Sequence, residues 1–131
     1  MSIGFESGNI EILHRMNKKF DLRTVRRTSR LLDKYGIRQT GFLLLGGPGE
    51  TRSSVAESLA FADALPLDAV KPSAGIRIYP HTPLARLSVA EGVIAPDDDL
   101  LYPRFYLAEG LEGWLDETVE TWMSGRPHWI R

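Results

Sequence analysis

An apolar run that leads directly into a glycine-rich turn constrains this chain more than any other feature. Residues 41–51 read GFLLLGGPGET. Such a run, closed by glycine and proline, is typical of a buried strand that ends in a turn. Two similar motifs, GFESG at residues 4–8 and RIYPHTPL at residues 77–84, are separated from it by helical sequence. This alternation of strands and helices predicts an α/β fold with a parallel sheet.

Three strands are expected, at residues 2–6, at residues 37–45 and between residues 68 and 79. The unbroken apolar end of the second strand predicts that helices cover both faces of the sheet. In the third strand, residues 75–79 have the clearest strand character. Pro72 removes one ladder donor there, which predicts an irregular start or an edge position.

The expected helices are recognised by polar capping residues at their starts and by apolar residues at helical spacing within them. Side chains with a capping oxygen precede each of the first three expected helices. A short helix is expected at residues 83–89, an acidic loop follows it, and a closing amphipathic helix carries apolar residues from Leu107 to Trp122. The expected N-caps are Asn9, Asp21 and either Thr51 or Ser53.

Composition excludes several classes of site. The chain has 131 residues, a formal net charge of -1 and no cysteine. Disulfides, zinc–thiolate sites and thiolate-bound iron–sulfur clusters are therefore excluded within these residues, and the three histidines are too scattered to indicate a metal site. Near-neutral charge argues against nucleic acid as a partner, and the arginines of residues 23–30 indicate a solvated helix face. No segment has the length and apolarity of a membrane span, so a cytoplasmic location is expected.

Polar residues follow the first two strands, at the edge where parallel α/β folds bind ligands. Glu6 and Ser7 suit hydrogen bonding to the two hydroxyls of a ribose, or they satisfy the backbone of the turn. Lys18 lies beyond a short helix, from which it could return to the same strand end, although most lysines are simply surface residues. Arg77 and Tyr79 end the third strand, and Ile78 between them offers an apolar edge to an adenine, or the three residues show only the ordinary alternation of a strand.

The glycine-rich turn is the second candidate for ligand contact. Gly46, Gly47 and Gly49 allow backbone amides to approach a ligand closely, and Pro48 stiffens the turn. Glu50 follows where a Walker motif would carry a lysine, and an acid there would repel phosphate. The turn therefore favours a ligand with a cationic or neutral polar group.

Taken together and in order, these motifs resemble the second half of the radical S-adenosylmethionine enzymes. The segments that carry the resemblance are GFESGNIEILHRMNKK, GFLLLGGPGET, RIYPHTPL and LLYPRFY, within residues 2–106. They are closest to the cobalamin-associated group that includes the anaerobic Mg-protoporphyrin IX monomethyl ester oxidative cyclase. The resemblance implies half of a TIM-type barrel, with strands four to six in residues 1–106, and a closing helix and tail in residues 107–131.

The resemblance also implies roles for individual residues. Glu6, with Ser7 beside it, matches the ribose-binding position, and Lys18 matches the basic residue that binds the methionyl carboxylate. The segment from Leu45 through Gly46, Gly47, Pro48 and Gly49 to Glu50 matches the part of the fifth strand that shapes the cofactor pocket. Ile78 and Tyr79 match the adenine contact of the sixth strand. One difference is Leu43, which stands where many members carry glycine.

The cysteine motif that holds the [4Fe-4S] cluster of this family is absent from the chain. The expectation is therefore a carboxy-terminal fragment of an iron–sulfur oxidoreductase, cyclase or methyltransferase that cleaves S-adenosylmethionine to a 5′-deoxyadenosyl radical. The fragment alone should be inactive. The intact protein would supply the amino-terminal half of the barrel and the cluster ligands. It would act on a small-molecule substrate and, as a member of this group, could also bind cobalamin.

Two other readings of the residues stay open. One is a stand-alone, non-catalytic module that binds S-adenosylmethionine or another nucleotide, because polar groups follow the strands without any redox ligand. The other is an interaction domain whose exposed sheet edges recruit a partner. An open sheet of three or four strands also predicts that the edges pair with another copy or are covered by the last helix.

Overall fold

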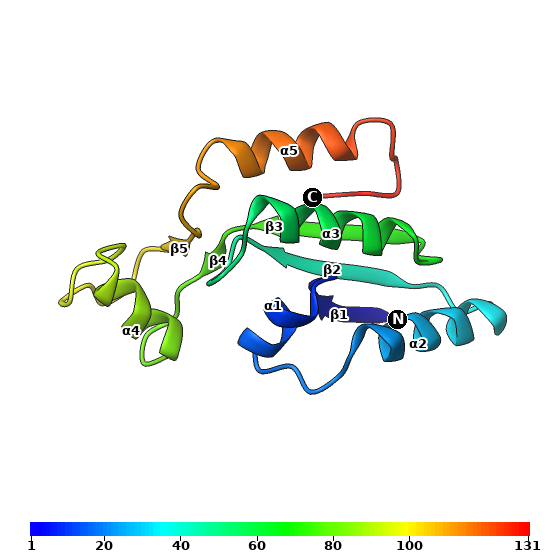
Figure 1. Ribbon diagram of the computed structural model, residues 1–131, viewed down its shortest axis with the longest axis horizontal. Coiled ribbons are helices and arrows are strands. Elements are labelled where there is room, and N and C mark those ends of the chain that lie inside the picture. The colour runs from blue at the N-terminus through cyan, green and yellow to red at the C-terminus, as the bar shows by residue number, and fades with distance from the viewer.

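The computed structural model describes residues 1–131 as a mixed α/β fold with five helices and two small sheets (Figure 1). The elements in chain order are β1 (Ser2–Glu6), α1 (Ile10–Arg15), α2 (Leu22–Lys34), β2 (Thr40–Leu45), α3 (Arg52–Asp63), β3 (Ala69–Ala74), β4 (Ile76–Arg77), α4 (Pro83–Ala90), β5 (Phe105–Tyr106) and α5 (Trp114–Met123).

The larger sheet contains β1, β2 and β3 in that order, and both neighbouring pairs are parallel. The prediction of an α/β fold with a parallel sheet is therefore confirmed. All three strands run in the same direction, so their carboxyl ends meet at one edge of the sheet. In Figure 1 this edge faces α4 and the small antiparallel sheet of β4 and β5.

The predicted N-caps are confirmed. The side chains of Asn9, Asp21 and Thr51 accept hydrogen bonds from the backbone amides of Ile12, Thr24 and Ser54 respectively. Each cap satisfies a donor that the first helical turn would otherwise leave without a partner. Three helix starts are thus fixed by local sequence alone.

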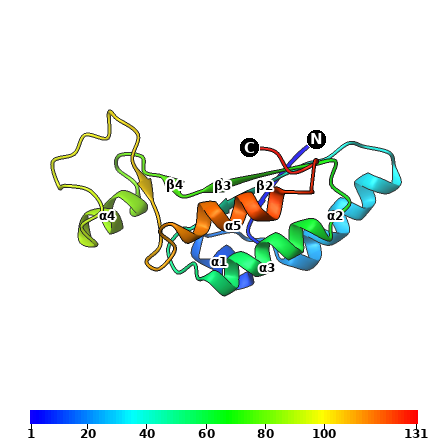
Figure 2. The same ribbon diagram turned by 90° about the horizontal axis from the view of Figure 1, so that it is seen from above.

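Helices cover only one face of the larger sheet, which corrects the expectation of cover on both. Figure 2 shows α1, α2, α3 and α5 on the same side of the strands. Leu43 and Leu45 of β2 are fully buried on that side, whereas Phe42 and Leu44, which alternate with them, are only partly buried. A short apolar run has no alternation from which the exposed side could be read.

The uncovered face carries the more polar residues of the two edge strands. In β3, Lys71 and Ser73 are exposed on this face, whereas Val70 and Pro72 are buried on the other. In β1, Glu6 is half-buried at the strand end. This distribution is the alternation expected of a sheet with one packed face.

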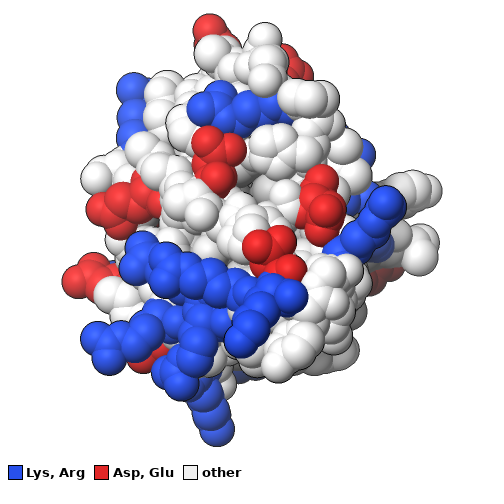
Figure 3. Space-filling model, turned by 90° about the vertical axis from the view of Figure 1, so that its right-hand side faces the viewer, with Lys and Arg blue, Asp and Glu red and all other residues white.

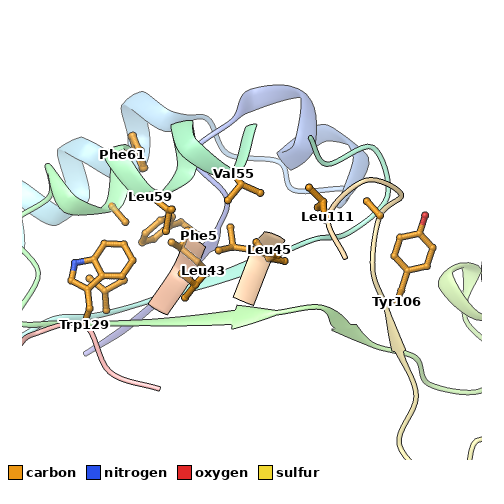
Figure 4. Close-up of a cluster of buried hydrophobic side chains, with 14 of the residues drawn as sticks. Phe5, Leu43, Leu45, Val55, Leu59, Phe61, Tyr106, Leu111 and Trp129 are labelled. Atoms are coloured by element: carbon orange, nitrogen blue, oxygen red, sulfur yellow. The ribbon is translucent and has the colours of Figure 1, made fainter. Parts of the chain in front are cut away.

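The core lies between the sheet and α3 (Figure 4). Val55 and Leu59 of α3 point toward Phe5 and Leu43 of the sheet, and all four are at most 1% exposed. Phe5 also meets Phe61 edge to face, with 5.7 Å between the ring centroids. This contact fixes α3 over the first two strands.

The third strand lies earlier in the chain than the pattern indicated. It ends at Ala74, because Gly75 adopts a φ of +85° and turns the chain out of the sheet. The prediction that residues 75–79 are the best-defined part of this strand is therefore wrong. Within this segment only Ile76 and Arg77 form a strand, β4, and it pairs with β5 instead. Pro72 does lie in an edge strand, as predicted.

The last helix begins at Trp114, so residues 107–113 precede it as a loop rather than forming its first turns. The tail beyond the helix, not the helix itself, pairs with the edge of β3. The Val70 amide donates to the His128 carbonyl at 2.9 Å, and the Ile130 amide donates to the Val70 carbonyl at 2.8 Å. Trp129 between them is 3% exposed. One free edge of the sheet is thus partly covered by the chain itself.

The arginines of α2 form a basic face on the outside of the molecule. Figure 3, which views the molecule from the right-hand side of Figure 1, shows basic side chains gathered in its lower part. The four arginines of this face are Arg23, Arg26, Arg27 and Arg30. They border a hollow of about 470 Å³, and none of them forms an ion pair. None of the helices combines the length and the apolar character that crossing a bilayer requires.

The one-sided packing predicts different costs for two adjacent leucines. Leu43→Ala should lower the free energy of unfolding by about 3 kcal/mol, because it leaves a cavity in the core. Leu44→Ala should cost about 1 kcal/mol, because solvent can fill the space on the uncovered face. Urea denaturation of the two variants measures the difference. Equal losses would show that both faces are packed.

Candidate functional site

A cavity of about 590 Å³ opens at the edge of the sheet where the parallel strands end. The end of α1, the end of β2, the turn after β2, β4 and the start of α4 surround it. Its lining combines two cations with neutral polar and apolar side chains: Arg15, Met16, Asn17, Lys18, Leu44, Pro48, Ile76, Thr82, Pro83, Leu84 and Leu87. Both its place and its size are those of an ordinary small-molecule site.

Lys18 reaches this cavity because α1 ends in a Schellman motif. Asn17 has a φ of +58°, its amide donates to the His14 carbonyl, and the Lys18 amide donates back to the Leu13 carbonyl, both at 3.0 Å. Asparagine tolerates this left-handed conformation better than most residues. The predicted return of Lys18 to the end of the first strand therefore has a defined backbone cause.

Glu6 occupies an unusual backbone conformation at the end of β1. Its φ is +70°, and the pairing of β1 with β2 is irregular between Ile3 and Glu6. A Cβ atom placed on Gly4 would come within 2.9 Å of Glu6 Oε1, so the carboxylate lies over the space that glycine leaves open. Non-glycine residues held in this region cost about 1–3 kcal/mol and are concentrated at functional sites.

The charges of Glu6 and Lys18 act on each other without a direct ion pair. Partial burial raises the pKa of the Glu6 carboxyl above its usual value, and the nearby Lys18 ammonium offsets part of that rise. Lys18 is therefore near enough to the Glu6 carboxylate for their charges to interact, but only Lys18 lines the cavity.

Ser7 is placed differently from its predicted partner Glu6. It is fully buried, and its hydroxyl accepts from the Asn9 amide at 3.0 Å and lies 3.2 Å from the Ser58 hydroxyl. The Ser58 hydroxyl also accepts from the Gly8 amide at 2.9 Å. Ser7 therefore ties the end of β1 to α3, and its hydroxyl does not face the cavity.

Side chains from other segments pack against the glycines of the turn, so the backbone there is not open to a ligand. A Cβ atom on Gly47 would come within 2.5 Å of Ile76 Cδ1, and one on Gly46 within 2.7 Å of Leu107 Cδ1. One on Gly49 would come within 2.6 Å of Arg15 Nε. The turn is thus a packing site for three distant segments, and only Pro48 of the turn lines the cavity.

Glu50 stabilises the turn from inside. It is 3% exposed, and its carboxylate accepts from the Ser54 hydroxyl and, at 3.4 Å, from the Gly46 amide. Burial raises the pKa of this carboxyl, and the two hydrogen bonds offset part of the rise. The acid that distinguishes this turn from a phosphate-binding loop is therefore directed into the protein.

The remaining predicted residues do not line the cavity. Leu45 and Ile78 are at most 2% exposed and belong to the core, as does Leu43. Tyr79 is 55% exposed and its ring lies 5.0 Å from the Arg77 guanidinium. The apolar surface that the cavity does present comes from neighbouring positions, Leu44 and Ile76.

Sequence reasoning missed most of the lining. Arg15 and Met16 lie at the end of a helix whose sequence does not distinguish them from surface residues. Leu44 could be assigned to a face of the sheet only once the covered face was known. The signal that could have been used is Asn17, because asparagine after a short helix marks a left-handed turn. The start of α4, from Thr82 to Leu87, reaches the cavity only through tertiary folding.

No protein-family model matches this chain, and no curated protein shows significant sequence similarity to it. Nor do three or more His, Asp or Glu side chains converge on a point where they could hold a metal ion.

Replacing Glu6 by glycine should stabilise the protein. Glu6→Gly removes the strain of the left-handed conformation and should raise the free energy of unfolding by about 1 kcal/mol. Glu6→Gln keeps the strained backbone and removes only the charge, so it separates the two effects. Chemical denaturation at neutral pH measures both. A loss of stability in Glu6→Gly would show that the conformation carries no strain.

The buried Glu50 should make the protein less stable as pH rises. A raised folded-state pKa means that the folded protein binds the proton more tightly than the unfolded chain. The contribution is complete below the usual pKa of 4.5 and is lost as pH rises through the folded-state value. Glu50→Gln should therefore flatten the decline in unfolding free energy that begins as pH rises above 4.5. Exposed Glu109→Gln is the control, and identical slopes in the two variants would contradict the assignment.

Proposed function

We propose that this chain is one half of the barrel of a radical S-adenosylmethionine enzyme, and that the cavity at its strand ends takes part in binding S-adenosylmethionine. The observation that carries the proposal is that Lys18 lines this cavity and is near enough to Glu6 for its charge to act on the Glu6 carboxyl. Glu6 is held in a strained backbone conformation, and Lys18 is held by a Schellman motif. Neither arrangement is needed to bury the core.

The chemistry of these residues fits the polar parts of S-adenosylmethionine. The Lys18 ammonium can donate to the methionyl carboxylate, and the Glu6 carboxylate can accept from the two ribose hydroxyls. The side chains of Leu44, Pro48 and Ile76 give the cavity an apolar wall on which the adenine can pack. Ser7 and Glu50 would act indirectly, by fixing the strand end and the turn.

The residues of this chain do not fit an iron–sulfur cluster, since it has no cysteine and no convergent set of ligands. In the proposal, the cluster ligands come from the other half of the barrel. Bound S-adenosylmethionine supplies a 5′-deoxyadenosyl radical when it is reductively cleaved. The present residues would bind and orient the cofactor.

The one-sided sheet supports the half-barrel interpretation. In a TIM-type barrel the helices surround the strands, and the inner face of the sheet lines the interior. Helices on one face only, with Lys71 and Ser73 on the other, are the arrangement that half of such a barrel would have. The outer edge of β1 would then pair with a strand from the missing half, because no strand of this chain occupies it.

The test is binding of S-adenosylmethionine to the chain, followed by NMR titration of its backbone amides. Lys18→Gln should weaken binding about tenfold or more, because it removes a charge-assisted hydrogen bond worth about 1.5–3 kcal/mol. Glu6→Gln should weaken it to a similar degree. Shifts should be concentrated at residues 4–8, 16–18 and 44–48.

The neighbouring Lys19 gives a matched control, because it is exposed and does not line the cavity. Lys19→Gln should leave the affinity unchanged. If Lys19→Gln and Lys18→Gln weaken binding equally, the effect is one of net charge and the proposed site is wrong. Absence of any shift in the wild-type chain at millimolar cofactor would also count against it.

A further inference from the structure

The cavity contains more positive charge than the proposed cofactor uses. Its lining includes two cations, Arg15 and Lys18, and no carboxylate. Lys18 has a compensating charge in Glu6, whose pKa responds to it. A cation beside an apolar cavity needs a counter-charge once solvent is displaced from the site. Arg15 is therefore the group to explain.

The Arg15 guanidinium has no partner in the protein. It takes part in none of the ion pairs and none of the side-chain hydrogen bonds. No carboxyl group with a shifted pKa responds to it either. Its five N–H donors are free for a ligand.

The guanidinium is nevertheless positioned. A Cβ atom on Gly49 would come within 2.6 Å of Nε, 2.7 Å of Cδ and 2.8 Å of Cζ of Arg15. The side chain therefore lies against Gly49, whose φ is +81° and which has no side chain of its own to occupy that space. Arg15 as a residue is exposed, so a ligand in the cavity can reach it.

We propose that Arg15 binds the anionic group of a second ligand, an apolar carboxylate or phosphate that shares the cavity with the cofactor. Arginine binds both groups through two parallel hydrogen bonds. The side chains of Leu84 and Leu87, which the proposed cofactor does not use, provide an apolar surface for the rest of this ligand. The inference rests on the proposed function in naming this ligand the substrate of the enzyme and in placing the cofactor beside it.

The start of α4 also favours an anionic ligand in this cavity. Thr82 and Pro83 line the cavity, and Thr82 is the N-cap of this eight-residue helix. The positive end of the helix dipole therefore lies at the same cavity as Arg15. Both features favour an anion, and no acidic side chain of the lining opposes them.

The experiment is NMR titration of the 131-residue chain with 4-phenylbutyrate, with the uncharged 4-phenylbutanol as the matched probe. The acid should bind at least tenfold more tightly than the alcohol. Arg15→Gln should abolish this difference, and Arg86→Gln, a change at an exposed residue of α4 that does not line the cavity, should leave it unchanged. Phenyl phosphate in a third titration distinguishes phosphate from carboxylate as the preferred anion.

Equal affinity for the acid and the alcohol, or an acid affinity that Arg15→Gln does not alter, would overturn the proposal. A parallel titration with S-adenosylmethionine separates this result from the proposed function. Arg15→Gln should change cofactor affinity less than twofold, whereas Lys18→Gln should change it about tenfold. If the cofactor does not bind but the Arg15-dependent preference for the acid persists, the anion site stands and the proposed function fails.

Discussion

Burial of a single face of the three-stranded sheet is the constraint on which the rest of this structure depends. Phe5, Leu43 and Leu45 point toward α3 and the core, so the residues between them in sequence must point to the opposite side. That side is free of helices, and it is where Glu6, Leu44 and the exposed residues of β3 lie. A side chain on it can be selected for interaction, because its loss leaves no cavity in the core.

The glycine-rich turn shows how one local motif can serve packing and positioning at once. Its glycines leave room for Leu107, Ile76 and Arg15, which come from three separate parts of the chain. Glu50 and Ser54 hold the turn closed from inside. The turn therefore joins α1, β4 and the loop before α5 at the edge where the strands end. A replacement at any of these glycines would displace a side chain of the site or of the core.

Local sequence was sufficient wherever a single residue decides the local structure. Asn9, Asp21 and Thr51 cap their helices through their own side chains, and the apolar runs of β1 and β2 locate these strands. The predictions failed where the outcome depends on distant partners. Gly75 looked like the interior of a strand, but it ends β3 because the chain next pairs with residues 105–106. The destination of Glu50 likewise depends on Ser54 and Gly46 together, so its direction into the protein could not be read from the turn alone.

The two charged residues that the motifs did bring together differ in how they are held. Lys18 depends on a favourable motif, since its backbone closes the Schellman turn and asparagine supplies the left-handed residue. Glu6 also occupies a left-handed conformation, but it is not a residue type that tolerates this conformation well. Burial makes its ionised form less favourable as well. Both effects act against the folded state, and glycine at this position would remove them. A residue that costs stability twice, on the face that contributes least to the core, is best explained by what its carboxylate binds.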